Sequence, residues 1–510
     1  MHARNTIAES TLKPPWRALR LALGLGLAAA MAAAQATPPR AVQAAVAARA
    51  RRSFSPPAAT QAAASIQASA AAAAPAAARA SWTLAQAMAR ALSHSRRLRA
   101  AAAGERAARA GITAARAGWL PQLSVSEGLT RSDDPVFVFG SLLRQHVFGP
   151  DNFAIGSLNR PGPLNDWQSA AEARLSLWDG GQTLAAMRAA RLGAKSAGEA
   201  RRGLSSAIIA EVVAAYYGYR RSLADREAAR LAVAAARASA HDAGARYHAG
   251  MVVAADRLSA QVYLARMQQM QAAARAEVAI SQARLNRLLG RPLEAPLQLA
   301  NATANAAAGA AAPPSSLMAW QQRAAEQRPD LAQAHLAVGM AQARLRQADA
   351  AFWPQASAFA GVERDQSGLT GAGGSNWMAG IQLQLNVFHG GADAARRKQA
   401  QAGVAAAREQ EASLRSQVRL QVESAWQDWR TAQLQVALSR KTVAQAQAAW
   451  QIYERRYQSG LISITELLRA ETELTRARAG VAAATYQLEV SRAAAWNSMG
   501  ELTPARLGHS

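Results

Sequence analysis

The chain has 510 residues, half of them hydrophobic, and contains no cysteine. The absence of cysteine excludes disulfides, thiolate metal sites, a catalytic thiol and a lipid anchor on an N-terminal cysteine. The formal net charge is +25 at pH 7, but the basic residues are mostly arginines spread singly among alanines, without the clustered aromatic side chains of a nucleic-acid surface. We therefore expect solvated basic helix faces and no nucleic-acid partner.

Residues 1–36 have the pattern of a secretory signal peptide. Four basic residues precede the apolar run LALGLGLAAAMAAA, which ends in the A-x-A sequence at residues 34–36. A transmembrane anchor fits less well, because the run is short, rich in Ala and followed by Thr-Pro-Pro. We therefore predict that the chain is exported and that residues 1–36 are cleaved off. Residues 37–80, which follow the signal peptide, are predicted to form an Ala/Pro-rich tether.

Most of the remaining sequence is an internal duplication. The fragment RLSLWDGG ends at Gly181 and QLNVFHGG ends at Gly391, an offset of 210 residues, and ARYHAGMVVAADRLSA aligns with RRYQSGLISITELLRA at the same offset. This duplication predicts a first repeat over residues 81–292, a linker over 293–316 and a second repeat over 317–500. Residues 501–510 would form a C-terminal tail.

The first repeat is longer than the second because it carries an insertion. Pro121 and Pro354, which end matching segments, are 233 residues apart, whereas the downstream motifs are 210 apart. The additional residues belong to a segment rich in Pro, Gly and Asn, and we expect an insertion loop over residues 132–165.

Each repeat begins with a helical composition and continues with strands. Residues Leu84–Ala117 and Leu317–Ala351 favour helix, and the prolines that follow favour its end. Alternating apolar and polar residues then predict strands near 120–131 and 166–179 in the first repeat, and near 354–365 and 376–388 in the second. The expected apolar faces of the two clearer strands contain Trp167, Leu175, Leu177, Trp377, Ile381, Leu383 and Leu385.

A pair of glycines follows the second strand of each repeat and precedes a long helix. These pairs, at positions 180–181 and 390–391, predict a strand-to-helix turn; they are Gly180, Gly181, Gly390 and Gly391. No proline occurs between Pro163 and Pro292 or between Pro354 and Pro504, so helices of about 100 Å are possible after each pair. We expect antiparallel helical hairpins that turn at Gly250 and Gly460.

Four strands in one chain are too few to close a barrel in a membrane. The smallest membrane barrels have about eight strands, and an open edge in lipid would leave backbone groups unpaired. Three chains would supply twelve strands. The tryptophans at strand ends fit either an interfacial girdle or ordinary packing on a sheet.

The ordered motifs of residues 82–500 resemble the TolC-type outer-membrane efflux proteins. The resemblance rests on the duplicated order of helix, Pro-Gln strand, alternating strand, aromatic-x-Gly-Gly, long helix, Tyr-x-x-Gly and long helix. It implies a mainly helical fold with β-strands, in which a homotrimer forms a twelve-stranded transmembrane β-barrel continued by a periplasmic α-helical barrel. It also implies an outer-membrane exit duct for a tripartite efflux pump or type I secretion system, with a periplasmic adaptor and an inner-membrane pump or ABC exporter as partners.

The resemblance places a candidate entrance at the hairpin turns. Asp256 and Glu466 match the positions where the family has acidic residues, while Arg469 stands where some members have a second acid. Repeated by threefold symmetry, the two acids would line the constricted tip, attract cations and help to hold it shut. Alternatively, each is only an acid in the first turn of a helix, stabilised by the helix dipole. Tyr247 and Tyr457 would either pack at the turns or hydrogen-bond across the closed tip.

The sequence contains none of the common catalytic motifs that we searched for. It has no nucleophile-elbow motif, phosphate-binding loop, zinc-protease motif or EF-hand loop, and we expect neither cofactor nor metal. His241 and His248 lack a third ligand at metal-binding spacing. The alternative to a channel is a soluble periplasmic coiled-coil adaptor or scaffold, which would also have an export signal and Ala-rich hairpins. The matching strands of the two repeats favour the channel.

Overall fold

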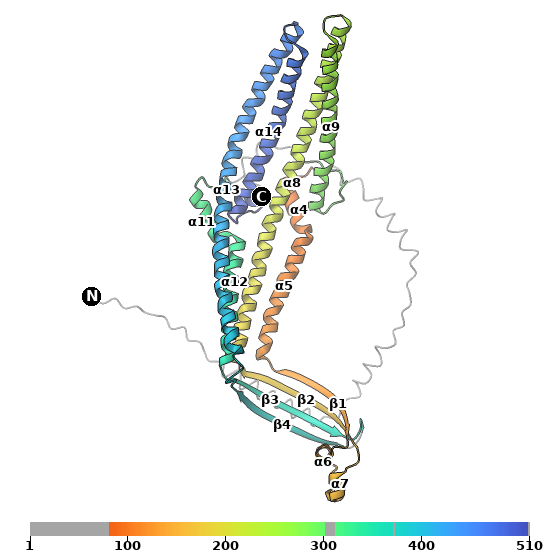
Figure 1. The fold of residues 1–510 in the computed structure, drawn as a ribbon, viewed down its shortest axis with the longest axis vertical. Coiled ribbons are helices and arrows are strands. Elements are labelled where there is room, and N and C mark those ends of the chain that lie inside the picture. The colour runs from red at the N-terminus through yellow and green to blue at the C-terminus, as the bar shows by residue number, and fades with distance from the viewer. Residues whose placement is uncertain (1–80, 301–311, 371–372, 508–510) are drawn as a thin grey trace, which may run out of the picture. The chain divides into compact units, whose positions relative to one another are not determined.

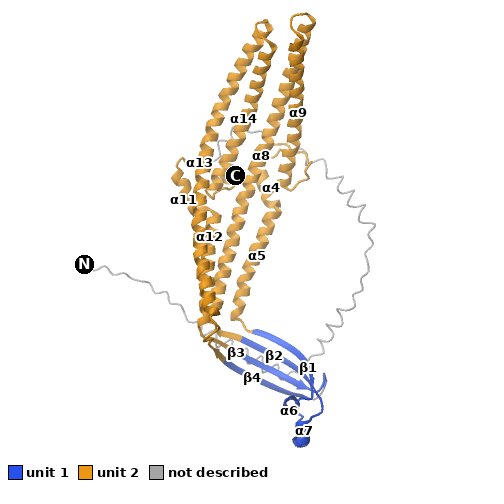
Figure 2. Ribbon diagram, viewed as in Figure 1, with its two compact units in different colours: residues 1–73, 122–174, 358–381 blue, residues 74–121, 175–357, 382–510 orange. Residues whose placement is uncertain are grey.

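The computed structural model describes residues 81–300, 312–370 and 373–507 (Figure 1). These residues form two compact units: unit 1 takes 122–174 and 358–381, and unit 2 takes the remainder (Figure 2). The predicted signal peptide and tether lie outside the described residues. None of the helices in the described ranges is both long enough and apolar enough to cross a membrane.

Unit 1 is built on a four-stranded sheet in the order β1-β2-β3-β4. The strands, which extend partly into unit 2, are β1 (Gln122–Ser132), β2 (Leu164–Trp178), β3 (Gln355–Gln366) and β4 (Gly373–Gln384). Each repeat thus contributes two neighbouring strands. The end of β4 is earlier than the sequence pattern indicated, so Leu385 lies beyond the strand instead of within it.

The register of β1 and β2 places apolar residues side by side. The two strands are antiparallel, and Leu129 lies opposite Trp167 while Val125 lies opposite Ala171. Since side chains alternate between faces, these residues share one face of the sheet. Glu127 lies on this face as well and accepts a hydrogen bond from the Trp167 indole.

The expectation of a loop over residues 132–165 was wrong, because this segment contains helices. They are α6 (Pro135–Arg144), the 3-10 turn η3 (Pro150–Phe153) and α7 (Ile155–Asn159). Asp134 caps α6 by accepting a hydrogen bond from the Phe137 amide at 2.8 Å, and Pro135 takes the first helical position. A proline of the segment whose Pro, Gly and Asn content indicated a loop therefore starts a helix, with Asp134 as its cap.

Unit 2 is helical. Its helices are α4 (Leu84–His94), α5 (Arg96–Arg116), α8 (Gln182–His248), α9 (Ala254–Leu289), α11 (Leu317–Gln327), α12 (Pro329–Asp349), α13 (Ala392–Gln458) and α14 (Ile464–Ser498). The two longest, α8 and α13, have 67 residues each, follow the two Gly-Gly pairs and pack against α9 and α14 as hairpins. Short 3-10 turns, Ala117–Trp119, Ala350–Phe352 and Ala505–Leu507, complete the unit.

The helices before the strands are each divided in two, where the composition had indicated one continuous helix. Ser95 separates α4 from α5; its backbone is extended and its hydroxyl accepts a hydrogen bond from the Leu98 amide at 3.2 Å. Arg328 separates α11 from α12, and Pro329 begins the second helix. The serine cap and the proline both favour a new helix start at these positions.

A single large hydrophobic core joins the two repeats within unit 2. Trp320 of α11 and Trp496 of α14 are buried there with Met88 of α4 and Val212 of α8. The start of the predicted linker also packs on this core, since the Tyr219 hydroxyl donates to the Leu297 carbonyl at 3.0 Å. A smaller cluster lies between the two hairpins near their turns.

Candidate functional site

The first Gly-Gly pair forms a strand-to-helix turn with left-handed backbone. Gly180 has φ 65° and Gly181 has φ 88°. A Cβ on Gly180 would lie 2.6 Å from the Ala350 carbonyl oxygen, so this position needs glycine for space as well as for conformation. Asp179 then caps α8 by accepting hydrogen bonds from the amides of Gly181 at 3.0 Å and Thr183 at 2.7 Å.

The turn at the second Gly-Gly pair has no side-chain cap from a described residue, and its acidic residue lies at a different position. His389 occupies the position of Asp179, and the acid comes instead from Asp393 in the first turn of α13. Asp393 is nearly buried and pairs with His389 Nδ1 at 3.5 Å and Arg396 Nη1 at 3.4 Å. A carboxylate at a helix N-terminus is stabilised by the helix dipole.

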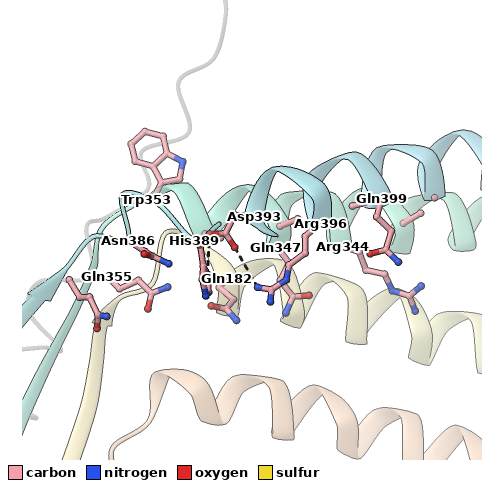
Figure 3. A pocket seen from close by; sticks show the side chains of 16 residues that line it. Gln182, Arg344, Gln347, Trp353, Gln355, Asn386, His389, Asp393, Arg396 and Gln399 are labelled. Atoms are coloured by element: carbon pink, nitrogen blue, oxygen red, sulfur yellow. Dashed lines mark hydrogen bonds and ion pairs between the residues drawn. The ribbon is translucent and has the colours of Figure 1, made fainter. Parts of the chain in front are cut away.

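An open polar cleft of about 690 Å³ adjoins this second turn in unit 2 (Figure 3). Its walls come from α12, α13 and the residues around them, and polar side chains dominate the lining. Arg344 and Arg396 contribute guanidinium groups, while Gln347 and Gln399 contribute amides. These groups can hydrogen-bond water or a polar, anionic solute.

The two hairpin turns have the same backbone. The Gly250 amide donates to the Tyr247 carbonyl at 3.0 Å, and the Gly460 amide donates to the Tyr457 carbonyl at 3.0 Å. The amide of the next residue in each turn donates to the carbonyl five residues back. This distance is 2.8 Å for Met251 and 2.9 Å for Leu461. Both glycines have positive φ, as the C-terminal end of a helix commonly requires.

Arg246 joins the two hairpins close to these turns. Its Nη1 and Nη2 donate to the carbonyls of Tyr457 and Gln458 at 3.3 Å each, and its guanidinium carbon is 4.7 Å from the centre of the Tyr457 ring. Asp242, one turn earlier in α8, accepts from Arg246 Nε at 2.9 Å. A cation at the carbonyl end of α13 also opposes the partial negative charge there.

Tyr457 is buried at this junction, with 5% of its surface exposed. Burial raises the pKa of its hydroxyl, and the negative charge of Asp242 raises it further, while Arg246 opposes the shift. The phenol therefore stays neutral at physiological pH. Asp256 also contributes to this rise, so one of the predicted entrance acids acts on the same group.

The other predicted entrance residues lie apart from this contact. Glu466 is exposed in the first turn of α14 and forms no ion pair with a described residue. Tyr247 is half-buried, and its ring lies under the Arg257 guanidinium carbon at 4.6 Å from the ring centre. Both tyrosines thus pack at the turns, each beneath an arginine from a different element.

Sequence reasoning missed Arg246 and Asp242. A signal for the arginine was present, since Arg-Tyr occurs at 246–247 and again at 456–457, at the offset of the repeat. The spacing of Asp242 and Arg246 also places them on one helix face. Their contact with the second hairpin depends on how the hairpins pack.

The apolar residues predicted on the strands are not packed into a core. Ile381 and Leu383 are 74% and 72% exposed, and Trp377 and Leu177 are exposed as well. Trp167 and Leu175 are half-buried in the chain.

No group of three or more His, Asp and Glu side chains among the described residues is placed to hold a metal ion. His241 and His248 both lie on α8.

One protein-family model matches this chain. A family model described as "Outer membrane efflux protein" matches residues 87–291 and 320–501, which together are most of the chain and follow the two repeats. No curated protein sequence gives a match.

Solved structures share the fold. CusC is similar with a TM-score of 0.70 and 20% identity, covering 82% of this chain and 92% of CusC. The outer membrane channel CmeC of Campylobacter jejuni has a TM-score of 0.69 and 17% identity, covering 82% and 85%. The outer membrane protein VceC of Vibrio cholerae has a TM-score of 0.68 and 18% identity, covering 82% and 96%.

The duplicated architecture, the family match across both repeats and the shared fold identify the chain. It belongs to the outer membrane efflux protein family.

Proposed function

We propose that three copies of this chain form a passive exit duct of a tripartite efflux pump or type I secretion system. The trimer would contain a twelve-stranded transmembrane β-barrel and a periplasmic α-helical barrel. A periplasmic adaptor and an inner-membrane pump or ABC exporter would be its partners, and the exporter would supply the energy.

The observation that carries this proposal is an incomplete sheet with exposed apolar residues. Among the described residues, the order β1-β2-β3-β4 leaves β1 and β4 as the outer strands of the sheet, each with one unpaired edge. Exposed strand edges are a liability that pairing with other strands removes, and lipid demands complete pairing. Ile381 and Leu383 would face hydrocarbon, while the alternating Gln382 and Gln384 would face water.

Other exposed apolar side chains on and beside the strands support the same assignment. Trp377 is exposed near the middle of β4 and Leu385 lies just beyond its end. Trp167, Leu175 and Leu177 would provide the corresponding apolar surface of β2. The polar cleft at the start of α13 would form part of the wetted wall of the duct.

The hairpin turns would form the periplasmic entrance. We assign Asp256 and Glu466 to its lining, where two rings of carboxylates would favour cations. Arg246 and Tyr457 would hold the neighbouring hairpins together beside these acids, because a cationic group caps the end of α13 from α8. Gly250 and Gly460 would allow the tight turns that bring the acids to the tip.

Reconstitution of the purified protein into planar bilayers tests the function. We expect detergent-dependent trimers that fractionate with outer membranes and produce single-channel currents with a preference for cations. Replacing Asp256→Asn together with Glu466→Gln should lower that preference, whereas Glu227→Gln on the exposed surface of α8 should leave it unchanged. A monomer that stays in solution without detergent would contradict the duct. Unchanged selectivity in the double variant would leave both acids as residues of a helix first turn only.

A further inference from the structure

The residues equivalent to those of the Arg246 contact, at the offset of the repeat, make no such contact with each other among the described residues of one chain. Arg246 of the first repeat binds the carbonyls of Tyr457 and Gln458 in the second. At the repeat offset of 210 residues, the equivalent arginine is Arg456, and the equivalent carbonyls are those of Tyr247 and His248. Arg456 is exposed, and its side chain forms no ion pair or hydrogen bond with a described residue.

The same relation holds for the apolar side chains beside Arg246. Leu468 of α14 and Ala243 of α8 are 8% and 0% exposed and belong to one cluster between the hairpins. Their repeat equivalents are Leu258 of α9 and Tyr453 of α13, which are 52% and 37% exposed. Leu258 and Tyr453 therefore stay exposed, each on the surface of its hairpin that faces away from the other hairpin; we call these the two outer surfaces. The equivalent residues, Leu468 and Ala243, are buried where the hairpins meet.

We propose that these two outer surfaces bind each other between copies of the chain. Leu258 of one copy packs against Tyr453 of the next, and Arg456 of that next copy donates to the Tyr247 and His248 carbonyls of the first. Each contact joins two different surfaces, so repetition closes a ring when the rotation between copies allows it. This inference rests on the proposed trimer and assigns the residues of its seam near the hairpin turns.

Two observations support the fit. The two turns have the same hydrogen-bond pattern, so the carbonyls of Tyr247 and His248 are presented as those of Tyr457 and Gln458 are. A carbonyl oxygen has two lone pairs, and the Tyr247 oxygen can accept from Arg456 while it accepts from the Gly250 amide. The Tyr247 ring already lies beneath Arg257, so Arg456 would bind the carbonyls alone.

The seam between copies differs from the junction within a chain in one respect. Asp242, which pairs with Arg246, has Ile452 as its repeat equivalent. Arg456 therefore lacks a carboxylate one turn earlier on its own helix. The seam depends on helix-end carbonyls and apolar packing, without the flanking ion pair.

Cysteine cross-linking tests the proposal directly, because the chain contains no native cysteine. We expect the Leu258→Cys, Tyr453→Cys double variant to form disulfide-linked dimers and trimers in membranes after mild oxidation. Each single variant should stay unlinked. Leu258→Cys with Leu434→Cys is the matched control, since Leu434 is also exposed on α13 but lies 19 residues away from Tyr453. The pair Ala243→Cys with Leu468→Cys should link within one chain and give no larger species.

A second measurement addresses Arg456. In the cross-linking pair, Arg456→Met should slow linkage about fivefold, as loss of charge-assisted hydrogen bonds predicts, whereas Arg455→Met should not. A trimer without linkage between positions 258 and 453, or with linkage between two copies of position 258, would overturn the seam and leave the duct standing. A protein that is monomeric in membranes would overturn both.

Discussion

Gly180 is confined by its surroundings as well as by its backbone. A β-carbon there would collide with the Ala350 carbonyl and approach Trp353 Cβ at 2.9 Å, and φ is 65°. We predict that Gly180→Ala lowers the free energy of unfolding by about 1–3 kcal/mol, the usual cost of forcing a side chain into such a conformation. Thermal unfolding followed by circular dichroism would measure the change.

The control for this substitution is Gly403→Ala. Gly403 is exposed inside α13, and a β-carbon there would meet no atom within 4 Å. The change should raise stability by about 0.5–1 kcal/mol, because alanine loses less conformational entropy in a helix. Equal effects of the two substitutions would show that Gly180 is not confined.

Glu471 is a buried acid between the two hairpins. Ser239 Oγ donates to its Oε1 at 2.8 Å, and its Oε2 has no hydrogen-bond partner among the described residues. Burial raises the pKa of Glu471 above its ordinary value of 4.5, while the hydrogen bond from Ser239 opposes the shift. Ionisation of this carboxyl therefore costs folding free energy.

The sign of the pH dependence follows from the raised pKa. The contribution of Glu471 to stability is fully present below pH 4.5 and is lost as pH rises through the folded-state pKa. We predict that Glu471→Gln, which still accepts from Ser239, raises the unfolding temperature at pH 7 and has little effect near pH 4. Unfolding scans at both values measure this, with exposed Glu473→Gln as control. An equal gain for Glu471→Gln at both pH values would argue against an ionised buried acid.

At the scale of elements, the insertion helix α6 is fixed to the sheet by buried polar contacts within unit 1. Ser141 Oγ donates to Asp166 Oδ2 at 3.0 Å, and Gln145 Nε2 donates to Asp166 Oδ1 at 2.9 Å. All three residues are buried, so loss of one partner leaves a buried group unsatisfied at a cost of about 1–3 kcal/mol.

We predict that Gln145→Ala loosens the insertion without unfolding the sheet. Limited trypsin digestion should cleave after Arg144 several times faster in this variant, because local opening controls access to this bond. Asn159→Ala, a change at an exposed position of α7, should cleave at the wild-type rate. Simultaneous loss of the β-sheet signal in circular dichroism would contradict a local effect.

At the scale of the whole molecule, exposure in one chain does not separate the two faces of β4. Both Leu383 and Gln382 are exposed there, and only the proposed trimer distinguishes lipid from water. We predict that Leu383→Arg lowers the amount of trimer in outer membranes, since a charge on the lipid-facing side of a strand costs up to about 2–4 kcal/mol, depending on its depth in the bilayer. Gln382→Arg should assemble normally, and gel analysis of membrane fractions measures both. Equal loss in the two variants would contradict the assigned faces.

Features that depend on neighbouring residues were readable from the sequence. The exclusion of proline from α8 and α13, the Gly-Gly pairs before them and the alternation along β4 follow from local backbone chemistry, which repeats wherever the residues repeat. Asp134 and Pro135 show what local sequence does not determine, because the same two residues can begin either a loop or a helix. The packing of α6 on the sheet favours the helix.

The contacts that join the repeats were decided by the tertiary structure. Arg246 and Tyr457 are 211 residues apart in the sequence. Nothing in the sequence around either residue indicates that Arg246 of α8 lies beside the end of α13. Burial of Glu471 and the close approach of Gly180 to Ala350 have the same origin. The sequence by itself determined the duplicated elements and the family, because these follow from local periodicity and motif order. Only the tertiary structure decided which side chains meet between hairpins, because such contacts depend on how separate elements pack.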